Sequence, residues 1–331
     1  MFPIYRPSEL AHHLGASVAD LRRVLKSPSP YYEELILFDP KKPDKRRVVL
    51  SVKAPLRVWQ NRFYRDVLLK SLKPSDFSHG GRQGFSIKTN AEKHSHSPFV
   101  YKADISNFYP GIHDRRVYRL FNEQFRCSPE IADLCCRLCT YRHHLALGLS
   151  TSPIIADQLL RTVDTRIGAA CARNGWVYTR FVDDITISGQ HDMQSAGIGS
   201  LIGRILRDHG FRAKRSKNEV GCNGEVTITG VRIIDGRLDV AKSYAQELDR
   251  QLRDALALTH DKDFEGPYYT YGQIAGRVRF ACWVNPRRAR TLMAKLARLS
   301  KRKMARHASE RGYVRLKKQL LRQEVQSHKA W

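Results

Sequence analysis

Two adjacent aspartates interrupt an otherwise apolar and β-branched stretch of the chain. Residues 180–189 read RFVDDITISG, which places Asp183 and Asp184 at the tip of an expected β-hairpin. Two carboxylates at this spacing repel each other, and burial of even one without a partner is costly. A divalent cation between them would offset both effects. An ordinary solvated turn, in which aspartate is a favoured residue, is the alternative that this stretch alone leaves open.

A third carboxylate ends the strand expected at residues 97–105, SPFVYKADI. Asp104 lies far upstream of Asp183 in the sequence, but two strands of one sheet can bring their ends together. Three converging carboxylates need a cation or a shared proton. Mg²⁺ prefers carboxylate oxygens, water and substrate phosphates as ligands. Two such ions about 4 Å apart lower the pKa of an attacking hydroxyl and stabilise a leaving pyrophosphate. The expected cofactor is therefore a pair of Mg²⁺ ions, with Mn²⁺ as a substitute.

The charge balance indicates a polyanionic partner. The 331 residues include 58 Lys and Arg against 32 Asp and Glu, a formal net charge of +26. Each cation placed on a phosphate gains from counterion release, so nucleic acid is the expected partner. A basic protein of a membrane surface is the alternative. No apolar run approaches the roughly 18 residues of a membrane span, and no lipidation signal is evident, so no membrane partner is expected.

The N-terminal residues and the cysteines bear on location. MFPIYRPSELAHHLG lacks the basic start and apolar stretch of a signal peptide. Seven cysteines, an odd number, fit a reducing compartment better than a disulfide framework. These features predict a globular protein of the cytosol.

The elements expected around the aspartates alternate between helix and strand. The hydrophobic spacing predicts short helices in 7–26, strands in 34–52, an amphipathic helix in 55–72, a Gly-rich loop at 78–90, helices in 114–145, 150–170 and 194–208, and short strands at 211–213, 226–234 and 237–240. From residue 243 onward the pattern is helical and strongly basic. The fold class expected is α+β in the centre, followed by a helical module.

Seven short motifs occur in a fixed order along the chain. They are TNAEKH (89–94), ADISNFYPGI (103–112), GLSTSP (148–153), FVDD (181–184), GFRAKRSK (210–217), TITGVRI (227–233) and GQIAGRVRFACWVNPRRARTL (272–292). Together they resemble a bacterial retron-type reverse transcriptase, from about residue 5 to residue 300. NAxxH, TSP and FVDD in this order are specific, whereas each motif alone is weak.

The resemblance implies a right-hand polymerase with fingers, a ferredoxin-like palm and a helical thumb. Residues 1–95 would form the fingers, 96–240 the palm with some fingers elements within 114–157, and 241–331 a basic helical thumb and C-terminal tail. The implied activity is DNA synthesis from deoxynucleoside triphosphates on an RNA template. The implied setting is the bacterial cytoplasm and a retron antiphage system, in which a structured non-coding RNA serves as template and primer and an effector protein acts separately.

The resemblance also assigns roles to individual residues. Asp104 and Asp183 would hold the two ions, with Asp184 completing the carboxylate set and the backbone carbonyl of Ile105 as a further ligand. Tyr109 would exclude a ribose 2′-hydroxyl, because a ring against C2′ leaves no room for an oxygen. The other expected site residues are Lys217, which would protonate the pyrophosphate, Arg47, which would contact the incoming triphosphate, and Gly148, Ser152 and Pro153 of the template-and-nucleotide motif.

Departures from the family pattern keep alternatives open. Ala146 and Leu147 replace the usual Pro-Gln, and Asp157 replaces a common asparagine. Another bacterial defence-associated reverse transcriptase with unusual templating is one alternative. An RNA-dependent RNA polymerase, a metal-dependent nuclease and a non-catalytic RNA-binding scaffold are the others.

Three further features have two interpretations each. Cys135, Cys136 and Cys139, followed by a histidine pair, could bind zinc, but their apolar helical context favours core packing. Asn90 and His94 could contact RNA or could brace the loop before the catalytic strand. The basic, aromatic-containing segment 277–329 could be a solvated helix face, although its single sign of charge favours a nucleic-acid surface.

Overall fold

The computed structural model divides the chain into two compact units, Met1–Asn223 and Gly224–Trp331. It describes residues 3–39, 42–193, 196–214, 219–221, 225–260, 269–301 and 304. Each unit is considered by itself below. None of the helices in these described ranges is both long and apolar enough to cross a lipid bilayer.

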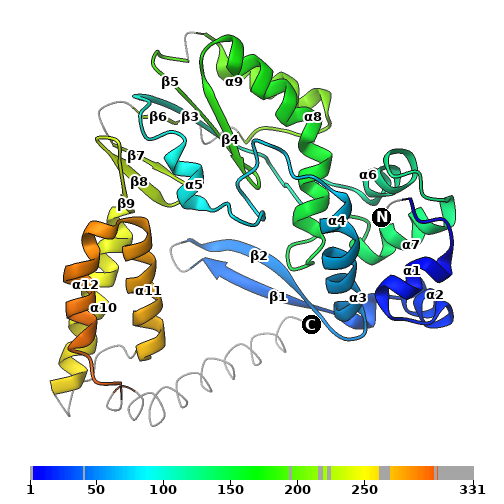
Figure 1. The fold of residues 1–331 in the computed structure, drawn as a ribbon, viewed down its shortest axis with the longest axis horizontal. Helices are drawn as coiled ribbons and strands as arrows, with labels where there is room; N and C mark the ends of the chain where they lie inside the picture. Colours follow the sequence, from blue (N-terminus) through cyan, green and yellow to red (C-terminus); the bar gives the residue numbers. More distant parts are fainter. Residues whose placement is uncertain are drawn as a thin grey trace. The chain divides into compact units, whose positions relative to one another are not determined.

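The first unit is organised around a four-stranded antiparallel sheet with the strand order β4-β5-β3-β6 (Figure 1). Its strands are β3 (Phe99–Asp104), β4 (Val177–Phe181), β5 (Asp184–Gly189) and β6 (Glu219–Gly221). β3 and β5 are buried at most positions because the sheet is covered by helices. The central pairing joins β3 to β5, and its register sets Asp104 opposite Asp184.

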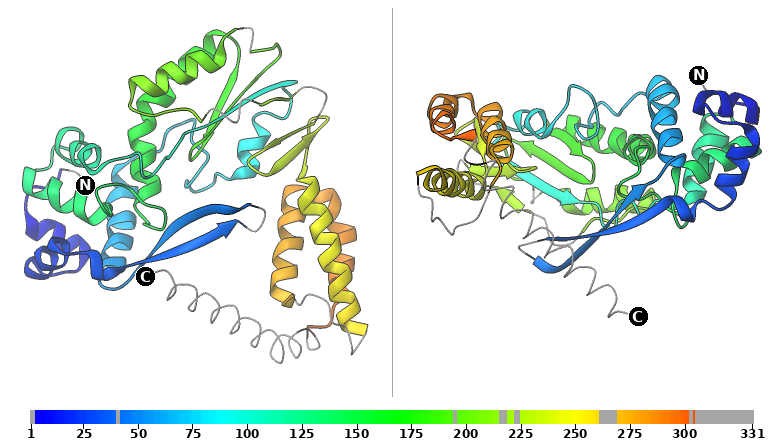
Figure 2. Two further views of the ribbon diagram at one scale, coloured as in Figure 1. Left: turned by 180° about the vertical axis from the view of Figure 1, so that it is seen from behind. Right: turned by 90° about the horizontal axis from the view of Figure 1, so that it is seen from below.

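Two long helices pack beside this sheet (Figure 2). α8 (Ser152–Arg173) begins with Pro153 in its first turn, where the missing N–H costs nothing. α9 (Ile198–Asp208) follows the β4–β5 hairpin. Apolar side chains of both helices and of β3 and β5 belong to one continuous core. The hairpin and α8 are therefore held in one rigid body of packed side chains.

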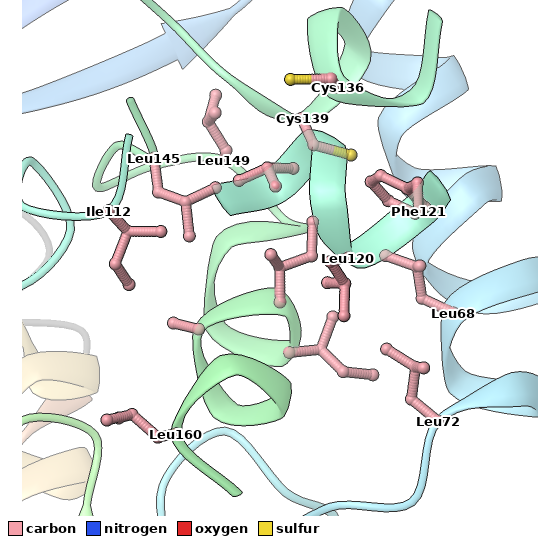
Figure 3. Close-up of a cluster of buried hydrophobic side chains, with 14 of the residues drawn as sticks. Leu68, Leu72, Ile112, Leu120, Phe121, Cys136, Cys139, Leu145, Leu149 and Leu160 are labelled. Atoms are coloured by element: carbon pink, nitrogen blue, oxygen red, sulfur yellow. The ribbon is translucent and has the colours of Figure 1, made fainter. Parts of the chain in front are cut away.

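The first 150 residues contain short helices, most of which pack into this core. They are α1 (Pro7–Leu14), α2 (Val18–Lys26), η1 (Ser29–Tyr31), α3 (Leu56–Arg62), η2 (Phe63–Leu68), α4 (Leu69–Ser71), α5 (Ile87–Glu92), α6 (Asp114–Arg119), η3 (Leu120–Gln124) and α7 (Pro129–Cys139). Figure 3 shows side chains that meet where these helices pack against α8, among them Leu68, Leu120 and Phe121 of the short helices and Leu160 of α8. Cys136 and Cys139 lie in the same cluster.

A two-stranded ribbon belongs to the same unit. β1 (Tyr32–Asp39) pairs antiparallel with β2 (Lys42–Val52). Its base is tied to the core by Tyr32 and Leu50, which are buried, whereas Leu35, Ile36, Leu37 and Phe38 are about half exposed. The ribbon therefore presents apolar as well as basic side chains to solvent.

In its described residues, the second unit combines a small sheet with three α-helices and a short 3-10 helix. Its elements are β7 (Glu225–Ile228), β8 (Val231–Ile234), β9 (Arg237–Val240), α10 (Lys242–His260), α11 (Tyr271–Val284), η4 (Pro286–Arg288) and α12 (Ala289–Ala297). The strands are antiparallel in the order β7-β8-β9. Arg288 donates two hydrogen bonds to Asp239, at 2.6 and 2.7 Å, and thereby ties η4 to β9. The TITGVRI segment forms the β7–β8 hairpin, which lies in the range 226–234 where the pattern predicts strand.

Two local expectations were wrong. Residues 78–90 are not entirely loop, because α5 begins at Ile87, where Ser86 accepts a hydrogen bond from the Thr89 backbone N–H at 3.2 Å and caps the helix. Residues 211–213 form no strand and contribute only an isolated bridge between Ala213 and Ile105. The limits expected for fingers, palm and thumb stay a prediction; the boundary between the compact units falls after Asn223.

Candidate active site

The three aspartates meet at one end of the central sheet. Asp104 is the last residue of β3, and its register partner Asp184 is the first residue of β5. The Ile105 backbone N–H donates to the Asp183 carbonyl at 3.0 Å, which joins the end of β3 to the hairpin tip. Ordinary strand pairing therefore brings together carboxylates that are far apart in the sequence.

The electrostatics of Asp183 reflect this convergence. Burial, together with the neighbouring charges of Asp104 and Asp184, raises the pKa of Asp183 to about 6. The Asp183 and Asp104 carboxyl groups also interact by a hydrogen bond that favours the protonated form. The arrangement is that of neighbouring carboxylates whose repulsion a cation would relieve. Lys214 approaches it, with Nζ 3.7 Å from Asp104 Oδ2.

The turn that carries Asp183 is backbone-strained. Val182 and Asp183 connect β4 to β5 as a two-residue loop, and Val182 has φ +60°. A β-branched residue in this region is an outlier, and the cost is of order 1–3 kcal/mol. Gly80 lies against the turn, since a Cβ at that position would stand 2.7 Å from the Val182 backbone nitrogen. The surrounding structure thus holds the turn in a conformation it would not adopt alone.

Tyr109 lies close to this carboxylate cluster. Burial and the charge of Asp183 raise the pKa of its phenol to about 12, so it is un-ionised at neutral pH. Its ring centroid is 5.0 Å from that of Phe108, which is buried and in turn lies 6.5 Å from Phe211. Phe108 therefore serves the core, whereas Tyr109 is the partly buried member of the pair nearer the aspartates.

The GLSTSP segment forms the approach to α8. Gly148 has φ +105°, and a Cβ there would stand 2.2 Å from the Leu50 carbonyl oxygen, so only glycine fits between this loop and β2. Ser152 is buried, and its hydroxyl accepts a hydrogen bond from the Ala146 N–H at 3.4 Å. Pro153 lies next to Gly81, whose Cβ would approach it to 3.3 Å. The loop is thereby fixed between the ribbon and the Gly-rich segment.

Most of the first unit and the start of the second match a known protein family. Residues 40–233 match the family model described as reverse transcriptase (RNA-dependent DNA polymerase). The chain belongs to this family. Its members are RNA-directed DNA polymerases, a class of nucleotidyltransferase, and the polymerase fold expected from the motifs is confirmed by the family match and the mixed helix-and-sheet architecture.

Individual relatives point to the retron type. The chain is 28% identical to the retron Mx65 reverse transcriptase of Myxococcus xanthus over 70% of this chain and 59% of that protein. It is 24% identical to the retron Ec86 reverse transcriptase of Escherichia coli over 86% and 87%, respectively. The chain therefore spans under two thirds of the first relative and most of the second. The retron-type resemblance is confirmed.

One solved structure illustrates the distance to other reverse transcriptases. The foamy viral protease–reverse transcriptase in complex with double-stranded DNA is 14% identical, with a TM-score of 0.44 over 78% of this chain and 38% of that one. Likeness at this level adds nothing to the family assignment.

Reverse transcriptases use divalent metal ions, and the residues here fit such an ion. The donor set consists of carboxylate oxygens, which hard cations prefer, and the burial and repulsion that raise the pKa of Asp183 are effects that a bound cation would offset. In the described part of the chain, no three His, Cys, Asp or Glu side chains are close enough together to hold a metal ion as they stand. The fit therefore lies in the type of the ligand atoms.

Arg47, an expected site residue, is not among the residues that the structure places beside the aspartates. Arg47 lies on β2 opposite Leu37, exposed on the ribbon. Lys217 lies outside the described residues. Lys214, three residues earlier, is the cation that the structure places beside Asp104; reasoning from sequence did not single it out, although it belongs to the same GFRAKRSK motif.

His94 of the NAxxH signature is an internal brace of this reverse transcriptase. It is fully buried, with Nδ1 2.7 Å from the Ser188 hydroxyl and Nε2 2.7 Å from the Thr179 hydroxyl. Burial lowers its pKa to about 3, so the ring stays neutral. Since these hydroxyls belong to β4 and β5, His94 clamps the two strands of the aspartate hairpin and is not available to contact RNA.

The cysteines of α7 are also internal. Cys135 and Cys139 are fully buried, and Cys136 donates its S–H to the Asp114 carbonyl at 3.3 Å. Burial raises the pKa of the Cys136 thiol to about 12. His143 is highly exposed and bonds Asp114 at 2.7 Å. The thiols therefore pack in the core as small apolar groups (Figure 3).

Proposed function

We propose that this chain is an active, metal-dependent reverse transcriptase that extends DNA on an RNA template. The observation that carries the proposal is the meeting of Asp104 with Asp183 and Asp184, where burial and then the charges of the other two aspartates raise the pKa of Asp183 to about 6. A cluster of this kind is unfavourable in an inert protein and is expected where divalent ions bind.

In this proposal Asp104 and Asp183 hold two Mg²⁺ ions, with Mn²⁺ as a substitute, and Asp184 and the Ile105 carbonyl complete the ligands. The ions would supply charge neutralisation and a more acidic attacking hydroxyl. The chain's own residues position the reactants: Gly148, Ser152 and Pro153 shape the floor of the nucleotide site. Most of the rate would come from this positioning and from electrostatic stabilisation.

Sugar selection is assigned to Tyr109. Its ring lies near Asp183 and packs against the ring of Phe108. A rigid ring at the sugar favours deoxyribonucleotides because a 2′-hydroxyl would collide with it. Arg47 and Lys217 remain proposals for contacts to the triphosphate and the leaving pyrophosphate.

The partner proposed is a structured non-coding RNA that provides the template and the priming hydroxyl, as the retron-type relatives suggest. Membership of a retron antiphage system, with a separate effector protein in the bacterial cytoplasm, is part of the same proposal. Sequencing of the nucleic acid that copurifies with the protein tests it: a covalent RNA–DNA molecule is expected. Repetitive or untemplated DNA would instead favour another defence-associated reverse transcriptase.

The activity is tested by nucleotide incorporation on an RNA template with a primer. Wild type should incorporate deoxyribonucleotides in preference to ribonucleotides, and Asp183→Asn should abolish incorporation. Tyr109→Ala should admit ribonucleotides, whereas Tyr109→Phe, which keeps the ring, should not. If wild type preferred ribonucleotides, the assignment as a DNA polymerase would be wrong. If the RNA is bound but no nucleotide is incorporated, a non-catalytic RNA-binding scaffold is the correct description.

A further inference from the structure

A buried arginine lies directly beneath the aspartate turn. Arg180 is in β4, two residues before Val182, and its side chain is only 2% exposed. Its guanidinium donates through Nη1 to the Val182 carbonyl at 2.8 Å. That carbonyl belongs to the peptide unit whose nitrogen is that of Asp183. The hydrogen bond therefore fixes the peptide plane from which the Asp183 side chain departs.

Two carboxylates of α8 hold the guanidinium in place. Asp164 accepts from Nε at 2.9 Å and from Nη2 at 2.7 Å, and Asp157 accepts from Nη2 at 2.6 Å. Tyr178 donates its hydroxyl to Asp164 at 2.7 Å, and the Ser75 N–H donates to Asp157 at 2.9 Å. Each nitrogen of the Arg180 guanidinium donates a hydrogen bond, so the group is held in one orientation.

The network connects the tip to rigid elements on both sides. α8 supplies the carboxylates, and the segment before Gly80 pairs with β4, where the Arg180 N–H donates to the Phe77 carbonyl at 2.8 Å and the His79 N–H donates to the Arg180 carbonyl at 2.8 Å. Gly80 then closes against the outside of the turn. The unfavourable φ of Val182 is thus maintained by a hydrogen bond from inside and by close packing from outside.

We propose that Arg180, oriented by Asp157 and Asp164, is the positioning residue that sets the Asp183 carboxylate for metal binding. It touches neither substrate nor metal and acts through the Val182–Asp183 peptide. This inference rests on the proposed metal-dependent function of the same site. Partners of this kind, one step removed from a metal ligand, commonly change metal affinity or activity by about 10- to 100-fold when replaced.

The chemistry of Asp157 also follows from this role. Its two oxygens each accept one hydrogen bond, from Arg180 and from Ser75. An asparagine has a single acceptor oxygen, so it would leave either the guanidinium or the Ser75 N–H unsatisfied. A carboxylate at this position therefore makes the orientation of Arg180 stricter than an amide would.

The test compares Arg180→Lys with Arg166→Lys in the full-length protein. Lysine keeps the charge but lacks the planar fork that reaches two carboxylates and a carbonyl together. Arg166 is the matched control, because it is also paired with an aspartate, Asp208 at 2.9 Å, but is partly exposed on α8. For each variant, thermal unfolding, Mn²⁺ binding followed by electron paramagnetic resonance, and the kcat and KM of deoxynucleotide incorporation are measured.

Arg180→Lys should bind Mn²⁺ about tenfold more weakly and lose at least about tenfold in kcat, with the KM for nucleotide changed less than about twofold. Arg166→Lys should match wild type in thermal unfolding, in Mn²⁺ binding and in the kinetic constants. If Arg180→Lys is folded at the assay temperature and binds Mn²⁺ as wild type does, Arg180 is only a structural residue and the inference is wrong, even if the melting temperature has fallen.

A second variant covers the case in which Arg180→Lys does not fold. Asp157→Asn keeps the Arg180–Asp164 pair and should weaken Mn²⁺ binding in the same direction, by about threefold; unchanged binding overturns the inference. Failure of the proposed function gives a different result, because wild type itself would then neither bind Mn²⁺ nor incorporate nucleotides. That result would remove the inference as well.

Discussion

Removal of the Asp183 charge should stabilise the metal-free protein while abolishing its activity. The folded protein raises the pKa of Asp183 from its ordinary value of 3.8 to about 6, through burial and then through the charges of Asp104 and Asp184. The unfolded chain has no such environment. At neutral pH, folding must therefore hold an ionised carboxylate against unfavourable surroundings, and Asp183→Asn relieves this cost with little change in shape.

The size of this stabilisation and its dependence on pH follow from proton linkage. A pKa difference of this size corresponds to about 3 kcal/mol, at about 1.4 kcal/mol per pH unit, and access of water to the cluster reduces the expected gain to about 1–3 kcal/mol. Because the folded-state pKa of Asp183 is the higher one, wild-type stability falls as the pH rises from about 4 to about 6. Below that window Asp183 is protonated in both states, so the variant should lose its advantage.

The assay is thermal or urea unfolding with a chelator present, at pH 4 and pH 8. At pH 8 the variant should melt higher by about 2–4 °C for each kcal/mol. Addition of Mn²⁺ should stabilise wild type more than the variant and narrow or reverse the difference. Asp133→Asn, which removes an exposed ion pair with Arg137, is the control and should change stability by at most about 0.5 kcal/mol. A variant no more stable than wild type at pH 8 would show that the carboxylates do not repel.

Three further substitutions have definite expected outcomes. Gly148→Ala should destabilise the protein by at least about 2 kcal/mol in urea unfolding, because its Cβ would overlap the Leu50 carbonyl; Gly175→Ala, which has φ +65° but open space around it, should cost about 1 kcal/mol. His94→Ala should cost about 2–4 kcal/mol, because Thr179 and Ser188 each lose a buried hydrogen bond and a cavity replaces the ring, although Ser188 keeps its bond to Ser97. The RNA affinity of the folded variant should equal that of wild type; a selective loss of RNA binding would contradict its role as a brace. Thr270→Ala should lower stability by about 1 kcal/mol by removing the N-cap of α11, whereas Thr270→Ser should not.

The meeting of the aspartates could be predicted because it depends on local patterns. The alternation around Asp183 marks a hairpin, and the apolar run before Asp104 marks a strand, so both place a carboxylate at the end of a strand. The pairing of these two strands then brings the carboxylates together, with Asp104 opposite Asp184. The β7–β8 hairpin was predictable for the same reason, since Gly230 follows a β-branched run and takes φ +85°.

The arginine network could not be predicted from such patterns, because it joins elements that are distant in sequence. Arg180 is an ordinary polar residue of an alternating strand until α8 is packed against it. A signal was nevertheless present: Asp157 and Asp164 are seven residues apart and share one face of a helix with the buried residues Gly168 and Cys171, although Arg161 on the same face offers a local ion pair as the alternative. Two buried acids of this kind require a cationic partner. The conformation of Val182 had no signal, since it is imposed by Gly80 and Arg180 together.

The contact at Gly148 limits where the β1–β2 ribbon can bend. The Leu50 N–H donates to the Leu147 carbonyl at 2.8 Å, and no space remains between the backbones at Gly148. Any bending of the ribbon must therefore pivot beyond Leu50, on the side of the ribbon tip. The base of the ribbon and the loop before α8 are consequently fixed to each other. Only the outer, solvent-exposed part of β1 and β2 is left free to bend.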